Sequence, residues 1–163
     1  MYGIQNEPNG IAYGLFIAED YIGNDDCVLF LGDNIFLDDI TPAIKKFKKG
    51  ATVFLKKVRD GKRFGIAEVK RGKIISLEEK PAKPKGDLAV TGLYIYDNTV
   101  FKKIRKIPPS DRGEYEITDV NKLYLEENSL HFNILEKEWF DIGTVESLHT
   151  ASQFMKMKKR HEK

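Results

Sequence analysis

Two aspartates in this sequence each lie where an apolar segment ends in a glycine-containing turn. Asp33 follows the apolar run "CVLFL" (27–31), and Asp141 follows two aromatic residues and precedes Gly143. Ligands of open parallel sheets bind beyond the carboxyl ends of the strands, and Mg²⁺ prefers oxygen ligands that it shares with substrate phosphates. Taken alone, Asp33 and Asn34 are typical of a simple turn. A second carboxylate from a distant segment favours a shared metal site.

A second group of polar residues could bind a phosphorylated sugar. In "SLEEKP" (76–81), Lys80 lies at the end of a strand-like run, where it can supply a point charge to a phosphate. Glu79 beside it can accept hydrogen bonds from sugar hydroxyls, and Arg112 of "RGEYEITD" (112–119) can bind a phosphate with two hydrogen bonds. The simpler interpretations are an exposed Glu–Lys pair and a loop that leads into a helix.

The composition restricts the class of protein. The chain has 163 residues, 41% of them hydrophobic, which predicts one globular domain over residues 1–163. The net charge of +2 predicts no nucleic-acid partner. Cys27 is the only cysteine, which excludes a disulfide framework and favours packing as a small hydrophobe. No apolar run approaches the roughly 20 residues of a membrane span, so we expect a cytoplasmic protein with no membrane partner.

The order of the elements predicts the fold class. Residues 11–22 have helical spacing, 27–31 is typical of a strand covered on both faces, 41–49 begins with Thr41-Pro42 like a helix, and 51–58 is strand-like. Strand, helix and strand with short links indicate a βαβ unit and a parallel sheet. Because Arg71-Gly72 joins two strand-like runs, we expect a hairpin there.

The remaining segments complete a mixed sheet. Residues 88–97 are rich in β-branched and aromatic residues, as strands are. A helix over about 117–127, a strand near 130–136 and a closing helix from about Val145 follow. The sequence therefore predicts an α/β protein with a Rossmann-like, mixed and mostly parallel sheet, helices on both faces and inserted antiparallel strands.

Seven short motifs occur in an order that resembles a known family. They are "QNEPNGIA", "LGDNIF", "FGIAEV", "SLEEKP", "VTGLYIYDN", "RGEYEITDVN" and "WFDIGT", between residues 5 and 144. Together they resemble the sugar-1-phosphate nucleotidyltransferases, most closely those that transfer thymidylyl groups to glucose 1-phosphate. The resemblance implies an α/β Rossmann-like sheet with an inserted sugar-binding part, and it implies transfer of a nucleotidyl group from dTTP to glucose 1-phosphate with release of pyrophosphate.

The resemblance also implies roles for individual residues. Asp33 and Asp141 would bind Mg²⁺ and act in catalysis, and Lys80 and Arg112 would hold the sugar phosphate, Lys80 also as a catalytic residue. The residues that would contact the base are Gln5 and Gly10. The residues that would line the sugar pocket are Asn34, Gly65, Glu79 and Val90, the glycine and the valine through their backbones. The implied partners are a nucleoside triphosphate and a sugar 1-phosphate, and a homo-oligomer is a further expectation.

The sequence departs from the family at its beginning. These enzymes open with a strand and a Gly-rich loop of the form GxGTRLxPxT followed by a lysine, and Met1 falls after that segment. Three interpretations follow: a fragment of a full enzyme, which we favour; one half of a split enzyme completed by an N-terminal partner chain; and a non-catalytic module that binds a sugar phosphate or a nucleotide. As a fragment, the chain alone is expected to be inactive or weakly active.

Overall fold

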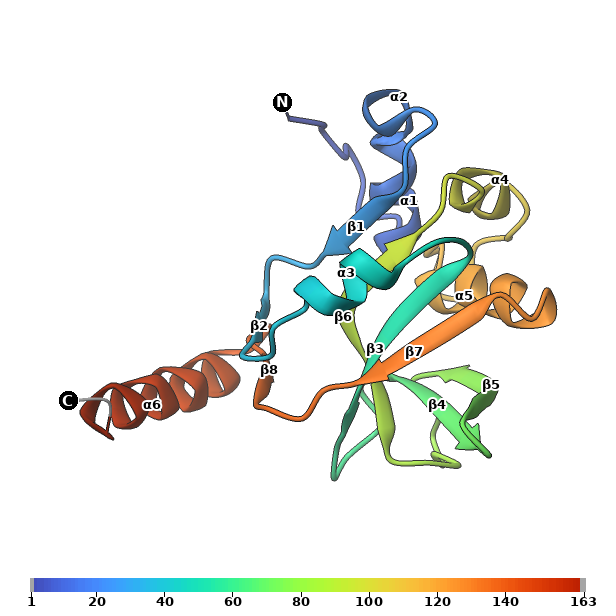
Figure 1. Cartoon of the computed structure of the whole chain (residues 1–163). Coiled ribbons are helices and arrows are strands. Elements are labelled where there is room, and N and C mark those ends of the chain that lie inside the picture. Colours follow the sequence, from blue (N-terminus) through green and yellow to red (C-terminus); the bar gives the residue numbers. More distant parts are fainter. Residues whose placement is uncertain (1, 162–163) are drawn as a thin grey trace.

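A six-stranded mixed sheet forms the centre of the computed structural model, which describes residues 2–161 (Figure 1). Its strands are β1 (Cys27–Phe30), β3 (Ala51–Lys57), β4 (Gly65–Lys70), β5 (Lys73–Glu79), β6 (Leu88–Tyr96) and β7 (Leu130–Ile134). A separate two-stranded sheet consists of β2 (Asn34–Phe36) and β8 (Trp139–Asp141).

The strand order corrects one part of the predicted topology. The order is β5-β4-β6-β3-β7, with β1 also paired to β6, and only the β3–β7 pair is parallel. The α/β class and the mixed sheet are confirmed, but the expectation of a mostly parallel sheet was wrong. Since β6 pairs antiparallel with both β1 and β3, these two strands run in the same direction without being neighbours. The predicted βαβ unit is present, with β6 inserted between its strands.

One edge of β6 is shared by two strands, which leaves a gap between them. β4 pairs with residues 88–89 of β6, whereas β1 pairs with residues 93–96. Opposite this gap, β6 bulges against β3, and the Thr91 hydroxyl donates to the Phe54 carbonyl at 2.9 Å. A bulge re-aims the backbone and interrupts pairing. Residues 90–92 of β6 therefore have no strand partner on this edge.

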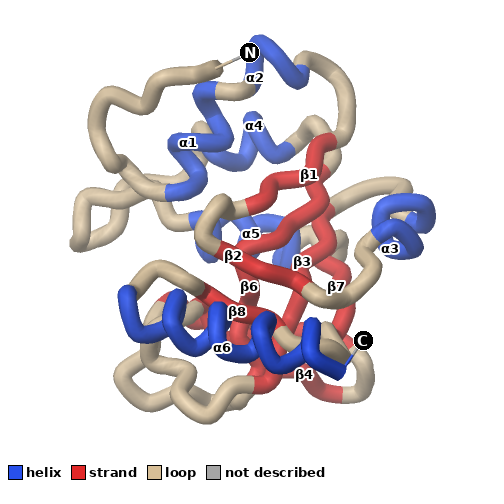
Figure 2. The backbone as a smooth tube through the Cα atoms, turned by 90° about the vertical axis from the view of Figure 1, so that its left-hand side faces the viewer, coloured by secondary structure: helices blue, strands red, loops and turns tan. Residues whose placement is uncertain are grey.

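Helices cover both faces of the sheet, as predicted (Figures 1 and 2). The helices are α1 (Ile11–Ile17), α2 (Glu19–Ile22), α3 (Thr41–Lys46), α4 (Val100–Ile104), α5 (Ile117–Glu126) and α6 (Val145–His161). Apolar residues of α1, α4 and α5 pack with one face in the larger core, and those of α3 and of β2 and β8 pack on the other. Helix α3 is three residues shorter than predicted, because Phe47 already has an extended backbone.

Local sequence signals explain two element boundaries. Arg71 and Gly72 both have positive φ angles, 51° and 73°, as the two central residues of a tight hairpin turn require. The Thr144 hydroxyl accepts a hydrogen bond from the Ser147 amide at 3.1 Å, and the Ser147 hydroxyl accepts from the Thr144 amide. This reciprocal capping begins α6 at Val145, as the sequence predicted.

β1 is less covered than the sequence predicted. Val28 is 43% exposed and Phe30 is 50% exposed, so one face of the strand is open in this chain. Cys27 and Leu29 point to the opposite face and pack on the larger core, where burial raises the pKa of the Cys27 thiol to about 11. The continuous apolar run therefore did not indicate burial on both faces.

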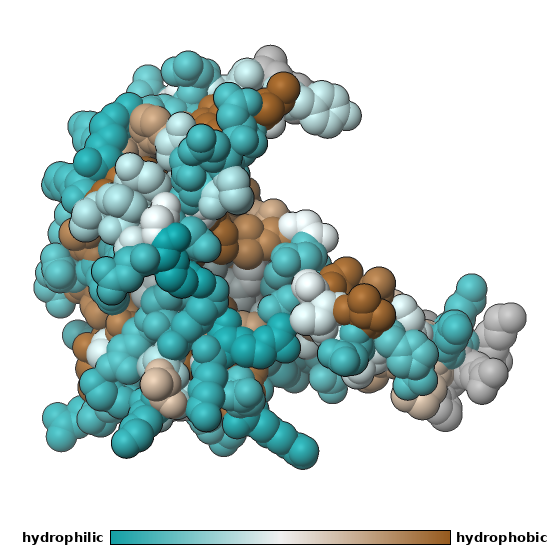
Figure 3. Space-filling view, turned by 180° about the vertical axis from the view of Figure 1, so that it is seen from behind, coloured by the Kyte–Doolittle hydropathy of each residue, from teal (hydrophilic) through white to brown (hydrophobic). Residues whose placement is uncertain are grey.

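Helix α6 extends away from the rest of the molecule (Figure 1). It contacts the body mainly at β8, where the Phe154 and Phe140 rings lie 5.2 Å apart. Seen from behind, the molecule is hollowed between this helix and the part that carries the N-terminus (Figure 3). Within residues 2–161, no helix is both long and apolar enough to cross a membrane.

Candidate functional site

A cavity of about 250 Å³ lies beside the gap in the β6 edge. The side chains around it come from both sheets, from the loop before α5 and from α5 itself. Eight residues predicted for the metal, phosphate or sugar line this one cavity: Asp33, Asn34, Gly65, Glu79, Lys80, Val90, Arg112 and Asp141. The structure thus brings together residues that lie more than a hundred positions apart in the sequence.

The small β2–β8 sheet brings the two aspartates together. Asn34 pairs directly with Asp141, and the Ile142 amide donates to the Asp33 carbonyl at 2.8 Å. A Cβ atom at Gly143 would lie 3.1 Å from an Asp141 carboxylate oxygen and 3.6 Å from an Asp33 oxygen. The two carboxylates therefore border the same small space, which glycine leaves open.

Glu79, the last residue of β5, also lines the cavity. It pairs with Gly65 across β4 and β5, and it accepts a hydrogen bond from the Thr118 hydroxyl. A Cβ atom at Gly65 would lie 3.0 Å from the Thr118 hydroxyl oxygen, 3.3 Å from a Glu79 oxygen and 3.8 Å from the Val90 Cβ. The absence of a side chain at Gly65 thus leaves room for a ligand beside the Glu79 carboxylate.

Lys80 has an unusual backbone conformation. Its φ angle is 40°, in the left-handed region that residues with a Cβ rarely adopt. Its amide donates to the Phe64 carbonyl at 3.1 Å, and its ammonium lies 3.8 Å from Glu79. Strained residues of this kind cluster at binding and catalytic sites, where the surrounding structure holds them.

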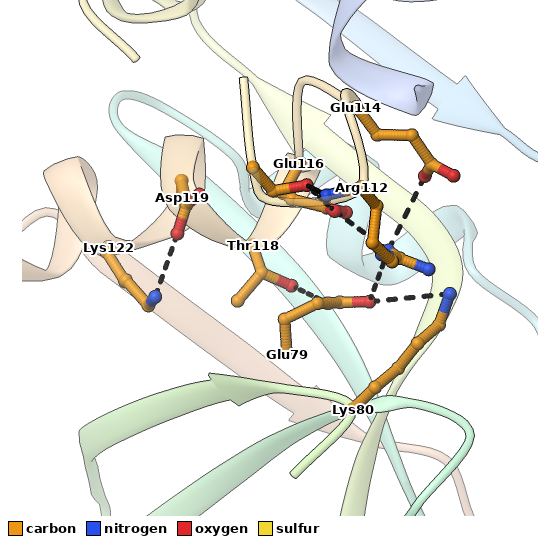
Figure 4. A network of polar contacts seen from close by, with 9 residues as sticks. Glu79, Lys80, Arg112, Glu114, Glu116, Thr118, Asp119 and Lys122 are labelled. Atoms are coloured by element: carbon orange, nitrogen blue, oxygen red, sulfur yellow. Dashed lines mark hydrogen bonds and ion pairs between the residues drawn. The ribbon is translucent and has the colours of Figure 1, made fainter. Parts of the chain in front are cut away.

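Arg112 is surrounded by three carboxylates (Figure 4). Its guanidinium lies 2.8 Å from Glu116, 3.5 Å from Glu114 and 3.7 Å from Glu79. The hydrogen bond to Glu116 is the main cause of the raised pKa of Arg112. A phosphate that binds Arg112 must therefore compete with Glu116 for the guanidinium.

Gln5 and Gly10 lie apart from the other predicted residues. They line a neighbouring recess of about 440 Å³, which shares Ile11, Leu31 and Glu114 with the main cavity. Gly10 has a φ angle of 95°, and a Cβ atom there would come within 2.6 Å of the Tyr115 carbonyl oxygen. Only glycine fits at this position without a shift of the backbone.

The charges of the main cavity suit a divalent cation. Five carboxylates line it, from Asp33, Glu79, Glu114, Glu116 and Asp141, against the three cationic side chains of Arg63, Lys80 and Arg112. Among the described residues, no group of three or more His, Cys, Asp or Glu side chains forms a complete metal site. Two carboxylates fit Mg²⁺, which usually keeps several waters and binds through one or two carboxylates and substrate phosphates.

Sequence reasoning missed several residues of the cavity. Trp139 donates from its indole nitrogen to the Asn34 side-chain oxygen at 2.7 Å, and Gly92 donates to the same oxygen through its amide at 3.1 Å. Thr118 lies in the first turn of α5, and its hydroxyl donates a hydrogen bond to Glu79. Only the contacts made in the fold identify these roles, although all three residues lie within motifs that the sequence displays.

Solved structures share this arrangement of elements. A protein of Bacillus anthracis described as a glucose-1-phosphate thymidylyltransferase, crystallised with sucrose, is 47% identical and superposes with a TM-score of 0.88, covering 94% of this chain and 64% of its own. A UDP-glucose pyrophosphorylase in complex with UDP-glucose, 23% identical, has the same fold with a TM-score of 0.83, over 94% of this chain and 65% of its own. The fold and the cavity thus define an α/β protein of the nucleotidyltransferase class.

The sequence places the chain within that class. The family model described as nucleotidyl transferase matches residues 1–158, and the chain belongs to this family. The glucose-1-phosphate thymidylyltransferase of Neisseria meningitidis is 45% identical over 161 residues, and that of Mycolicibacterium smegmatis is 44% identical over 161 residues. These alignments cover 94% and 95% of this chain, and the chain spans 56% of the length of both relatives.

Proposed function

We propose that this chain supplies the metal site and the sugar-phosphate site for nucleotidyl transfer from dTTP to glucose 1-phosphate, which gives dTDP-glucose and pyrophosphate. The observation that carries the proposal is the single cavity that is lined by Asp33 and Asp141 together with Glu79, Lys80 and Arg112. Such a cavity can bind the hydroxyls of a sugar and the negative charge of its phosphate. The two aspartates lie in the same cavity, where they can bind a metal ion.

The side chains of Glu79, Lys80 and Arg112 suit the two parts of a sugar 1-phosphate. Glu79 offers carboxylate oxygens to hydroxyl donors in the space beside Gly65. Lys80 and Arg112 supply the positive charge that a phosphate needs, and Arg112 can bind it with two parallel hydrogen bonds. Gly65 and Val90 line the same cavity and would contact the sugar through their backbones.

Asp33 and Asp141 are the residues that would hold Mg²⁺. When bound, the ion would neutralise charge on the transferring phosphates. The carboxylates outnumber the cationic side chains in this cavity, so a bare triphosphate would be repelled and a magnesium complex would be favoured. The charges of the cavity therefore support a magnesium cofactor.

The chemistry requires positioning more than covalent catalysis. A phosphate oxygen of the sugar phosphate attacks the α-phosphorus of the nucleotide, a new P–O bond forms, and the bond to pyrophosphate breaks with its electron pair on the leaving group. Lys80 and Arg112 would orient the attacking phosphate and reduce its charge repulsion with the triphosphate. Gln5 and Gly10, in the neighbouring recess, would contact the base.

Three finer expectations stay predictions: dTTP as the nucleotide, a cytoplasmic location, and a homo-oligomer or an N-terminal partner chain. The alternative function is a module that binds a sugar phosphate or a nucleotide without transfer. Measured binding together with turnover separates the two.

Titration calorimetry with glucose 1-phosphate, in the presence of Mg²⁺, tests the proposal on the chain itself. We expect binding that weakens about tenfold or more in Glu79→Gln and in Lys80→Gln. Exposed Lys73→Gln, on the β4–β5 hairpin, serves as the matched control and should bind as the parent does. Pyrophosphate release from dTTP and glucose 1-phosphate would support transfer. Binding without release, also after the Gly-rich N-terminal segment is added, would support the module, and no binding would overturn both.

A further inference from the structure

The side-chain amide of Asn34 is held in one orientation by donors from two different elements. Its oxygen accepts from the Trp139 indole N–H at 2.7 Å and from the Gly92 amide at 3.1 Å. Its nitrogen donates to an Asp33 carboxylate oxygen at 2.9 Å. A reversed amide would place its NH₂ group against two donors, so the hydrogen bonds permit only one orientation.

The space around the amide enforces the same arrangement. Asn34 is 8% exposed. A Cβ atom at Gly92 would lie 2.7 Å from the Asn34 amide carbon and nitrogen and 2.8 Å from its oxygen. Since real Cβ atoms do not approach that closely, glycine at 92 is what allows the side chain to rest on β6. The Trp139 ring is in turn held by an edge contact with Phe64, with ring centroids 5.3 Å apart.

We propose that Trp139 is a positioning residue that acts through Asn34 to orient the Asp33 carboxylate toward the metal. This inference rests on the proposed function, because it assigns a purpose to a chain of contacts that ends at a proposed metal ligand. Asp33 lies in the turn directly before a three-residue strand, and the amide of Asn34 holds its carboxylate by a hydrogen bond of 2.9 Å. Hydrogen-bond partners of metal ligands are known to set ligand orientation and affinity.

The three contacts belong to three separate segments. Asp33 and Asn34 come from the start of β2, Gly92 from the middle of β6 at the split edge, and Trp139 from β8. The position of the Asp33 carboxylate therefore depends on how the β2–β8 sheet packs against the six-stranded sheet. A change at Trp139 or at Gly92 should weaken metal binding although neither residue is a ligand.

Trp139 is the only tryptophan, so its indole N–H gives a single, unambiguous NMR signal. In the unaltered chain titrated with Mg²⁺, we expect this signal and the side-chain NH₂ signals of Asn34 to shift with the same midpoint. Shifts at Asp33 and Asp141 without any at Trp139 would overturn the inference while leaving the metal site intact. No shift at any residue of the cavity would overturn the metal site itself, and with it the inference.

Variants give the second measurement, with Mn²⁺ as the probe of metal affinity. Trp139→Phe removes the N–H but keeps an aromatic ring, and Gly92→Ala displaces the amide from the β6 side. Both should raise the Kd for Mn²⁺ about tenfold. This is the lower end of the losses that are typical when a hydrogen-bond partner of a metal ligand is removed. Phe140→Leu is the matched control, because it disturbs the same strand next to Trp139 but packs on Phe154. Equal losses in Trp139→Phe and Phe140→Leu would mean that Trp139 only stabilises β8.

Discussion

Asn34 and Asp141 are paired directly across the two strands of the β2–β8 sheet. This pairing fixes the distance between two segments that are far apart in the sequence, and it does so through backbone hydrogen bonds rather than through long side chains. Because Asp33 precedes Asn34, both candidate metal ligands lie at the same end of a rigid two-stranded unit. Their proximity is a property of the sheet and does not depend on a bound ion.

The first prediction concerns the two carboxylates as a unit. Asp33→Asn and Asp141→Asn should each weaken Mg²⁺-dependent binding of dTTP by at least about tenfold, because either change leaves one ionised ligand. The double variant should lose little more affinity for dTTP than each single variant, since the effects of substitutions at two residues that bind the same ion are not additive. Calorimetry with and without Mg²⁺ measures these effects. Binding by Asp33→Asn that equals that of the parent would reduce Asp33 to a turn residue.

Gly65→Ala tests the shape of the sugar pocket. The added methyl group would lie 3.0 Å from the Thr118 hydroxyl and 3.3 Å from Glu79, within the space that a sugar would use. We expect the Kd for glucose 1-phosphate to rise about tenfold, while the affinity for Mn²⁺ stays the same because the atoms nearest the added methyl group belong to Thr118, Glu79 and Val90 and not to the proposed metal ligands. Thermal unfolding followed in parallel checks that the variant folds. An unaltered affinity for the sugar phosphate would place the sugar elsewhere.

Glu116→Gln tests the competition for Arg112. Loss of the carboxylate 2.8 Å from the guanidinium frees it for a phosphate, so affinity for glucose 1-phosphate should rise about threefold. Glu114→Gln is the control, because it removes the same charge from an ion pair at 3.5 Å and leaves the hydrogen bond between Arg112 and Glu116 in place. Calorimetry compares the two. Weaker binding in Glu116→Gln would instead show that Glu116 holds Arg112 in the productive position.

The sequence predicted most elements because their signals are local. Helix α5, the Arg71-Gly72 hairpin and the start of α6 depend on periodicity, turn residues and a cap, all within a few positions. The insertion of β6 between β1 and β3 depends on pairing between distant segments, which no local pattern reports. This is why the mostly parallel sheet was the main error.

The residues of the candidate site likewise fall into those that local signals predict and those that depend on pairing between distant segments. Asp33 and Asp141 were predicted because each stands at a distinctive break after an apolar segment, Glu79 because it precedes Lys80 at the end of a strand-like run, and the resemblance to a family added Gly65 and Val90. Trp139 was missed because an aromatic residue within a strand is usually explained by packing. Its hydrogen bond to Asn34 depends on the β2–β8 register, which the sequence does not display.

Asp97 gives a prediction on stability and pH. This carboxylate, 7% exposed, accepts hydrogen bonds from the Gly50 amide at 2.7 Å, from Thr99 and from the Tyr124 hydroxyl at 2.9 Å. Burial alone would raise the pKa of Asp97, but these hydrogen bonds outweigh it and lower the pKa. The stabilisation is therefore fully present above the unfolded-state pKa of about 3.9, and it is lost as the pH falls through the lower folded-state pKa.

Asp97→Ala should lower the free energy of unfolding at pH 7 by about 3 kcal/mol, because it leaves buried donors without their acceptor. Urea unfolding at pH 7 and at about pH 3 measures the free energy of unfolding of both proteins. The difference in this free energy between variant and parent should shrink at the lower pH. Asp25→Ala, at an exposed aspartate, is the control and should change stability by less than about 0.5 kcal/mol. A difference that grows on acidification would contradict the direction of the pKa shift.

The backbone of Lys80 allows strain and charge to be separated by two substitutions. Lys80→Ala and Lys80→Gly both remove the ammonium, so both should weaken binding of glucose 1-phosphate by the same factor, about tenfold. Only glycine relieves the positive φ of 40°, so Lys80→Gly should be the more stable variant by about 1 kcal/mol. Calorimetry gives the affinities and urea unfolding the stabilities. Equal stabilities would show that Lys80 adopts this conformation without strain, and equal affinity in both variants and the parent would remove Lys80 from the phosphate site.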